Sequence, residues 1–329
     1  MARAPAPTSY RTLTWPAGTL FFLSSLPPSR ISTCCRLVFQ LEYLDLGRNR
    51  IESISKPACF SGLSNLASLH LEGNRLIALP PDGALAPLRS LRTLRLDFNK
   101  RIGAAGPFAF QSLTGLENLG LRGCGLSTAN LSVDAFARLP HLKSLDISGN
   151  KMKVVPTTQL SHLSNLEALQ LGGNPIQVLG SNFLKGLTNL RRLNFSDSTD
   201  LLKVESGAFL ALSTLGLIVF DRCPRLRSFG EGAFADLQVG LSLRDNEWTS
   251  VPPEVFSPRD NGVASIDVAD NPITCDCNAL PLFERLRHRG DSFGNESLVV
   301  CVHPEKWRGV PLADVEDEIN LVSCFQSLA

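Results

Sequence analysis

The chain repeats one phrase ten times between Leu41 and Ile273, and this repeat constrains its fold more than any other feature. The phrase is apolar-x-x-apolar-x-apolar-x-x-Asn-x-apolar, and its clean copies read LEYLDLGRNRI, LASLHLEGNRL, LKSLDISGNKM and VASIDVADNPI. Successive copies begin 23 to 26 residues apart. A fixed period of this length predicts a solenoid of stacked units rather than a closed globule. Such a stack has a long regular surface and no obvious catalytic cleft.

The middle of each phrase alternates between apolar and variable residues, which predicts a short strand with one buried face. In the first copy we expect Leu44 and Leu46 to point inward, and Tyr43, Asp45 and Gly47 to point outward. Parallel strands from successive copies would then form one sheet along the inner side of the stack. The outward residues of all copies would share its surface.

The asparagine of each phrase lies where the chain turns inward after the strand. Its amide can pair with main-chain groups that a buried turn would otherwise leave without partners. Cys124 and Cys223 replace this asparagine in the fourth and eighth copies, and we expect both to be buried structural thiols. Between strands, a Phe followed by x-x-Leu recurs, and these rings are expected to form an internal row under the convex side. Examples are Phe60, Phe110, Phe136, Phe209 and Phe234.

The array resembles the leucine-rich repeats of animal extracellular proteins, and the resemblance covers residues 34–324. The resemblance implies an α/β solenoid, a leucine-rich repeat horseshoe with a parallel concave sheet and a disulfide-bonded C-terminal cap. We therefore divide the chain into a divergent N-terminal segment (1–33), an array of about ten repeats (34–273) and a cysteine-rich cap (274–329). The Gly-x-Ile-Pro signature of plant receptor repeats is missing.

Four cysteines follow the last repeat, where a solenoid needs a cap over its apolar end. The segment from Cys275 onward resembles the C-terminal flank of Slit, Toll-like receptor and chondroadherin proteins. That resemblance implies Cys275–Cys301 and Cys277–Cys324 disulfides, although the sequence alone leaves three connectivities. The alternative is a zinc site made of Cys275, Cys277, Cys301 and His303. Disulfides would place the protein in an oxidising compartment, either secreted or on the extracellular face of the plasma membrane.

Three acceptor triplets for N-linked glycans fit that compartment, at Asn130, Asn194 and Asn295. Asn194 lies in a strand and is expected to point from the concave face, where a glycan would block part of the surface.

The N-terminal segment departs from the family. Its apolar run, Leu20 to Leu23, is too short and broken for a good signal peptide, and no N-terminal cap pattern follows. Cys34 lies in the same register as Cys59, 25 residues later, so a Cys34–Cys59 link between repeats is a further hypothesis. No apolar stretch approaches the roughly 20 residues that a membrane span needs. A receptor role would need a transmembrane part outside this sequence, so the receptor alternative is that the chain is a fragment of a transmembrane Toll-like receptor ectodomain.

The leading interpretation is an extracellular module that binds a protein ligand through its concave face, in immune recognition, cell adhesion or matrix. The alternative is a structural matrix protein that self-associates. The predicted binding residues are the outward strand positions. They are Tyr43, Asp45, His70, Glu72, Arg95, Asp97, Asn118, Arg122, Asp146, Gln170 and Arg192.

Other classes of function have little support. A net charge of +1 without long basic runs argues against nucleic acid as a partner. No catalytic, cofactor or metal motif stands out apart from the zinc alternative. One short motif, Arg289-Gly290-Asp291, matches the integrin-recognition triplet where the cap helix should end, although Arg and Gly at a helix end also have an ordinary capping role. Integrin is thus a second candidate partner.

Overall fold

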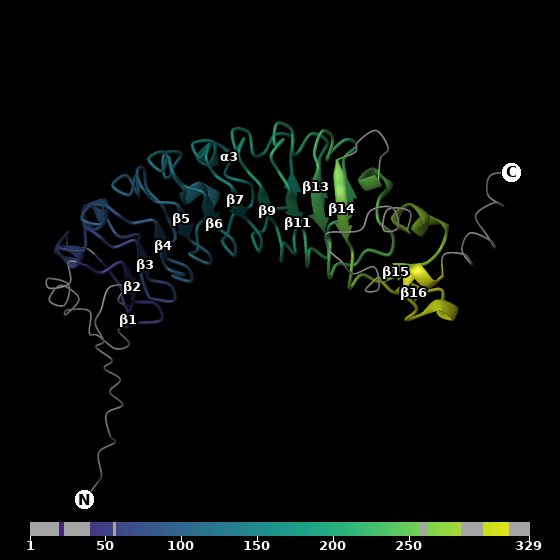
Figure 1. The fold of residues 1–329 in the computed structure, drawn as a ribbon, viewed down its shortest axis with the longest axis horizontal. Coiled ribbons are helices and arrows are strands. Elements are labelled where there is room, and N and C mark those ends of the chain that lie inside the picture. Colours follow the sequence, from purple (N-terminus) through teal and green to yellow (C-terminus); the bar gives the residue numbers. More distant parts are fainter. Residues whose placement is uncertain (1–19, 23–39, 55–56, 257–261, 284–298, 316–329) are drawn as a thin grey trace, which may run out of the picture.

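A computed structural model describes residues 20–22, 40–54, 57–256, 262–283 and 299–315 of the chain. The described repeats stack into an arc, with the strands along its inner side and short turns along its outer side (Figure 1). This is the predicted leucine-rich repeat solenoid. Each repeat contacts mainly its neighbours, because the sheet grows by one strand per repeat.

The concave side is a parallel sheet of 11 strands among the described residues. Ten of them are the predicted strands, and equivalent residues pair across them: Leu44 pairs with Leu69, and Leu69 with Leu94. One register shift occurs in the ninth repeat, between Val239 and Gly240. The ten strands are β2 (Tyr43–Asp45), β3 (Ser68–His70), β4 (Thr93–Arg95), β5 (Asn118–Gly120), β6 (Ser144–Asp146), β7 (Ala168–Gln170), β9 (Arg192–Asn194), β11 (Leu217–Val219), β13 (Val239–Ser242) and β14 (Val263–Asp267).

The eleventh strand is β1 (Leu20–Phe22), which pairs with β2 at the N-terminal edge of the sheet. β1 comes from the apolar run that was too short and broken for a good signal peptide. Further along, Cys59 is a free, half-buried thiol on the 3-10 helix η3 (Pro57–Phe60). The hypothesis of a Cys34–Cys59 link is therefore wrong for this structure, in which Cys34 lies outside the described residues.

The core is a double row of side chains between the sheet and the convex turns. The strand leucines are buried, and the phenylalanines stack beneath the convex side as the pattern predicted. The ring centroids of Phe209 lie 5.7 Å from Phe183 and 5.6 Å from Phe234. A second row continues from Phe195 to Phe220 at 5.6 Å. Aromatic pairs at such distances add stability beyond their buried area.

Short elements connect the strands across the convex side. They include a second parallel sheet, of three two-residue strands, which the sequence pattern did not predict. The connecting elements are α2 (Asp82–Leu85), η4 (Thr128–Asn130), α3 (Thr157–Leu160), β8 (Val178–Leu179), β10 (Lys203–Val204), β12 (Ser228–Phe229) and η5 (Pro253–Phe256).

The asparagines form the predicted ladder of amides. Asn174 Nδ2 donates to the carbonyl oxygens of Ile147 and Leu171, and its Oδ1 accepts from the Met152 amide. The asparagines that join their own turn to the preceding repeat in this way are Asn74, Asn99, Asn150, Asn174, Asn246 and Asn271. Cys124 and Cys223 take the same place, and their Sγ atoms donate to the carbonyl oxygens of Leu96 and Phe195. Both thiols are fully buried, as the phrase predicted.

The C-terminal segment closes the array with β15 (Ile273–Thr274) paired to β16 (Cys301–His303), accompanied by η6 (Cys277–Ala279), η8 (Glu305–Trp307) and η9 (Leu312–Asp314). A disulfide joins Cys275 to Cys301, with Cα atoms 5.6 Å apart. Because that bond takes two of the four thiol and imidazole ligands, the zinc alternative at this position is wrong. Cys277 is also disulfide-bonded, and its expected partner Cys324 lies outside the described residues.

Candidate functional site

The concave surface is built by the alternation within each strand. The central leucine of β2, Leu44, is buried, while Tyr43 and Asp45 on either side of it face out half-buried. Because the strands are in register, equivalent residues of successive repeats lie in rows across the sheet. The predicted binding residues therefore belong to one continuous surface.

At the N-terminal end of this surface, two rings and a carboxylate meet. The ring of Tyr43 lies 4.8 Å from that of His70, and His70 Nδ1 lies 3.5 Å from Glu72 Oε1. Burial raises the pKa of the Tyr43 hydroxyl, and the carboxylates of Asp45 and Glu72 raise it further. Tyr43 therefore presents a neutral phenol beside acidic groups.

Arg95 and Asp97 form a close ion pair, with 2.6 Å between Nε and Oδ2. Burial lowers the pKa of Arg95, but the hydrogen bond and charge of Asp97 outweigh it, so the pKa lies above its usual value. We call Tyr43, Asp45, His70, Glu72, Arg95 and Asp97 the concave cluster.

The prediction of Asp97 as a contact residue is wrong, because its side chain is only 2% exposed. Its Oδ1 accepts a hydrogen bond from the Arg122 amide at 2.9 Å, so it holds the turn of the next repeat. The carboxylate packs against Gly120, where a Cβ atom would collide with it. The absent side chain of Gly120 thus lets Asp97 fold down into the surface. Within the cluster Asp97 supplies charge and supports Arg95.

The other predicted residues lie further along the same surface. Asn118 Nδ2 donates to Thr93 Oγ1 at 3.3 Å, and Asp146 Oδ1 accepts from the Ser148 amide at 2.9 Å. Arg192 at the start of β9 is exposed. Arg122 and Gln170 belong to a separate feature.

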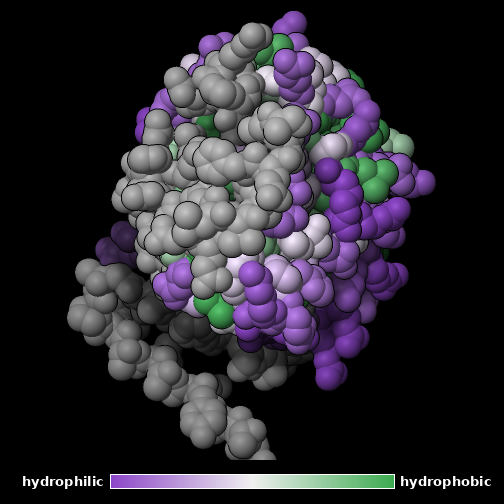
Figure 2. Space-filling model, turned by 90° about the vertical axis from the view of Figure 1, so that its right-hand side faces the viewer, coloured by the Kyte–Doolittle hydropathy of each residue, from purple (hydrophilic) through white to green (hydrophobic). Residues whose placement is uncertain are grey.

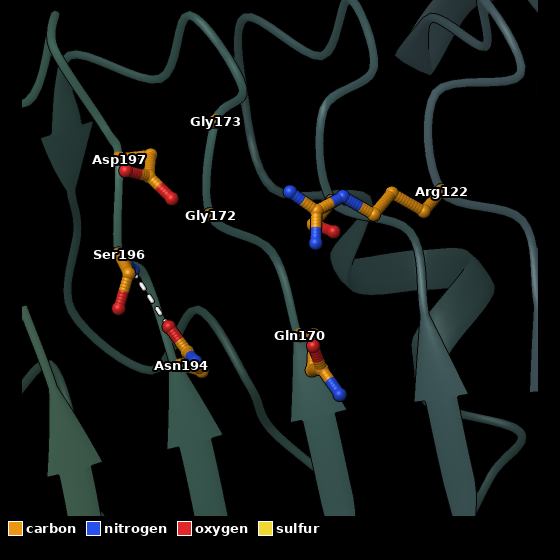
Figure 3. Close-up of a pocket in the computed structure, with 8 residues that line it drawn as sticks. Arg122, Gln170, Gly172, Gly173, Asn194, Ser196 and Asp197 are labelled. Carbon is orange, nitrogen blue, oxygen red and sulfur yellow. Dashed lines mark hydrogen bonds between the residues drawn. The ribbon is translucent and has the colours of Figure 1, made fainter. Parts of the chain in front are cut away.

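That feature is a hollow on the concave side of β7 and β9, with Arg122 on one side and Asp197 on the other (Figure 3). Gly172, Gly173, Asn194 and Gln170 also line it. We call it the Arg122–Asp197 hollow. Its enclosed space is about 60 Å³, whereas sites for small molecules usually enclose hundreds of cubic ångströms. It can accept one small chemical group rather than a metabolite.

Sequence reasoning missed two features beside this hollow. Phe98 is 50% exposed, with a left-handed φ of 60°, and the Arg122 guanidinium lies 5.6 Å from its ring centroid. Asp197 is bound by Arg222, with Nε 2.6 Å from Oδ1. Both residues occupy the left-handed turn position that Gly73 and Gly173 fill in other repeats. An aromatic ring at a position typical of glycine was the available sequence signal.

The predicted modification and adhesion motifs are spread over the molecule. Asn130 is exposed on η4, on the convex side, and Asn194 ends β9 on the concave side. Asn295 lies outside the described residues, as does the triplet Arg289-Gly290-Asp291.

Within the described part of the chain, no group of three or more His, Cys, Asp or Glu side chains is arranged to hold a metal ion. None of its helices is long and apolar enough to span a membrane. Viewed from the C-terminal end, the coloured surface is mostly hydrophilic, with apolar residues scattered among the polar ones (Figure 2).

The leucine rich repeat family matches residues 38–76 and 124–176 of the chain. Podocan of Mus musculus is 30% identical over 117 residues, which are 35% of this chain and 18% of podocan. Podocan-like protein 1 of Homo sapiens is 36% identical over 117 residues, which are 35% of this chain and 22% of that protein. The matched part thus spans about a fifth of the length of these relatives.

Solved structures extend the similarity to most of the chain. One is a chain of the octameric complex of Latrophilin 3, Unc5D and the LRR part of FLRT2. It shares 25% identity with a TM-score of 0.61, and the match covers 87% of this chain and 91% of that one. A chain of the mouse RP105/MD-1 complex shares the fold at 21% identity and a TM-score of 0.59, with 93% of this chain and 57% of that one covered.

Proposed function

This chain is a leucine-rich repeat protein of the animal extracellular type, and we propose that it binds another protein through the concave cluster. We place it outside the cell, either secreted or on the outer face of the plasma membrane. The Cys275–Cys301 disulfide supports that location, because such bonds persist in oxidising compartments.

The observation that carries the proposal is the convergence of Tyr43, His70 and Glu72 from two adjacent repeats. Partly exposed tyrosine rings are common anchors of protein interfaces. The cluster contains three carboxylates, of Asp45, Glu72 and Asp97, against the one guanidinium of Arg95. Its charge is therefore complementary to a ligand surface that presents lysine or arginine.

The dimensions of the concave surface favour a protein over a small molecule. Eleven strands spaced about 4.8 Å apart give a sheet about 48 Å across, which suits an interface of standard size. The Arg122–Asp197 hollow encloses too little space for a metabolite. The breadth of the sheet is therefore what favours a binding role.

The structural neighbours are consistent with this role. The chain at 25% identity comes from an octameric complex with Latrophilin 3 and Unc5D. We assign the present chain to the same broad activity, recognition of an extracellular protein in immunity, cell adhesion or matrix. Self-association in the matrix is the alternative, as is a role within a longer receptor ectodomain.

A screen of purified extracellular and ectodomain proteins, with the full chain as bait, tests the proposal. Hydrogen exchange of each complex then maps the bound surface. We expect a ligand with a basic surface and slowed exchange in residues 43–45, 68–70 and 93–95. Slowed exchange on the convex turns alone would contradict the proposal. Light scattering of the free chain addresses the alternative, because a dimer that protects those same strands would support self-association instead.

A further inference from the structure

Asn194 lies at the end of β9 and lines the Arg122–Asp197 hollow. We propose that Asn194 carries an N-linked glycan whose first sugar is seated in this hollow, and that the glycan restricts protein binding to the concave cluster. The second part of this proposal rests on the proposed function, whereas the first part does not.

The side chain of Asn194 is held with its amide nitrogen available. Its Oδ1 accepts a hydrogen bond from the Ser196 amide at 2.7 Å (Figure 3), and Ser196 is the third residue of the acceptor triplet. Its Nδ2 donates no hydrogen bond to any described residue. The ladder asparagines differ, because Asn174 Nδ2 is used twice, by the carbonyl oxygens of Ile147 and Leu171. A sugar on Asn174 would break those bonds, and a sugar on Asn194 breaks none.

The chemical step is the ordinary transfer from a lipid-linked oligosaccharide diphosphate in the secretory pathway. Asn194 Nδ2 forms a bond to the anomeric carbon of the first N-acetylglucosamine. The bond from that carbon to the lipid diphosphate breaks, and the lipid diphosphate leaves with its electron pair. Nδ2 gives up one proton to the base of the transferring enzyme. The acceptor triplet Asn194-Phe195-Ser196 is the recognition element of that transfer.

The hollow matches the acetamido group of the first sugar in size and in polarity. The enclosed 60 Å³ takes the acetamido group of the sugar, and the rest of the glycan extends over the open concave side. Ser148 and Gln170 line the hollow with a hydroxyl and an amide, which can bond to the acetamido group and to sugar hydroxyls. The Arg122 guanidinium makes no ion pair with a described residue and can donate to the same oxygens. Gly172 lies tightly against the backbone of Ser196, where even a Cβ atom would collide with the Ser196 carbonyl oxygen.

A glycan at β9 would divide the concave surface into two parts. The concave cluster lies on β2 to β4 and in the turns that follow them, so its nearest strand is four strands away from β9. At about 4.8 Å per strand this is a separation of about 19 Å. Arg122 on the near side of the hollow bonds to Asp97, so the glycan would border the cluster there. Tyr43 on β2 and His70 on β3 lie further away and stay open, while a ligand that spans the whole sheet is excluded. This is why the glycan would confine binding to the N-terminal part of the surface.

Peptide mass spectrometry of the chain secreted from mammalian cells tests the site. Peptide-N-glycosidase in heavy-oxygen water converts a glycosylated asparagine into labelled aspartate. We expect the label at Asn194 in most chains, and in the Ser196→Thr variant, which keeps the triplet. Ser196→Ala keeps the main-chain amide that bonds Asn194 Oδ1 and should abolish the label. Unlabelled Asn194 in secreted wild-type chain, beside a labelled standard glycoprotein in the same digest, overturns the proposal.

The position of the sugar is tested by arginine modification with phenylglyoxal. We expect Arg122 to react several-fold more slowly in the glycosylated wild-type chain than in Ser196→Ala. Arg92, which pairs with Glu117 away from the hollow, should react equally in both. Equal reaction rates of Arg122 in the two proteins would show that the first sugar does not lie in the hollow, even if Asn194 is glycosylated. Neither readout uses a protein ligand, so failure here is distinct from failure of the proposed function.

Discussion

The side-chain amide of Asn99 donates a hydrogen bond of 2.9 Å to the carbonyl oxygen of Leu71, 28 residues earlier in the chain. The same nitrogen donates to Leu96 at 2.8 Å, and Asn99 Oδ1 accepts from the Leu76 amide at 3.1 Å. One fully buried side chain thus joins two consecutive repeats. These hydrogen bonds help to keep equivalent residues of successive repeats aligned on the concave surface.

Replacing Asn99 by alanine should destabilise the array by about 2 kcal/mol, since one buried amide is left unpaired and a packed side chain is lost. The Leu76 amide loses its partner, while Leu71 keeps the hydrogen bond from Asn74. Urea unfolding measures the change. Asn165→Ala is the matched control, because exposed Asn165 donates only to Pro140, and it should cost less than about 1 kcal/mol. Equal losses in the two variants would argue against the ladder.

Ser198 occupies the ladder position of the seventh repeat, and its buried Oγ has no hydrogen-bond partner. Because an unpaired buried hydroxyl is unfavourable, Ser198→Ala should leave stability unchanged or raise it by up to about 1 kcal/mol. The same urea experiment measures it. A clear loss of stability in Ser198→Ala would show that the hydroxyl is paired after all.

The ladder thiols should be inert. Burial raises the pKa of Cys124 and of Cys223 to about 12, against small opposing hydrogen bonds. Thiolate is therefore scarce at neutral pH. Timed alkylation of the native chain, read by peptide mass spectrometry, should label half-buried Cys59 first. Cys124 and Cys223 should react only after unfolding, and early labelling of either would contradict their assigned burial.

The Asp197–Arg222 pair should make a small, pH-dependent contribution to stability. The hydrogen bond from Arg222 lowers the pKa of Asp197. Burial opposes this, and the charges of Arg222 and Arg122 lower the pKa further. Stabilisation is therefore complete above the unfolded pKa of about 4 and is lost as pH falls through the lower folded value. Because the pair is about half exposed, Arg222→Gln should cost only about 0.5 kcal/mol at pH 7.

Thermal unfolding across pH measures this contribution. The difference between Arg222→Gln and wild type should shrink below pH 4 and in high salt. A difference that grows on acidification would reverse the sign of the linkage and contradict the assignment.

Much of the fold was predictable because period-two alternation and a fixed repeat length determine the strand register. The pairing of Leu44 with Leu69 follows directly from the phrase. The small convex sheet could not be predicted from the phrase, because strands such as Val178–Leu179 are too short to give a periodic signal. β1 was also missed, since Leu20–Phe22 forms a strand only by pairing with β2, which is non-local information.

The site was predictable as a surface but not as a set of contacts. The strand pattern placed Asp97 outward with its neighbours. Whether its carboxylate stands free or folds down depends on the missing side chain at Gly120, one repeat further on. The exposure of Phe98 likewise depends on a left-handed turn that usually favours glycine. Such details arise between repeats and are invisible within a single phrase.

The central claim is that the concave cluster binds a protein, and affinity measurements on a matched pair of variants test it most directly. Tyr43→Ala removes a ring from the cluster, and Phe108→Ala removes a 40% exposed ring from the convex side. With the ligand from the screen, interferometry should show about a 30-fold loss for Tyr43→Ala, equivalent to ~2 kcal/mol, and no loss for Phe108→Ala. Unchanged affinity for Tyr43→Ala together with a loss for Phe108→Ala would contradict the account.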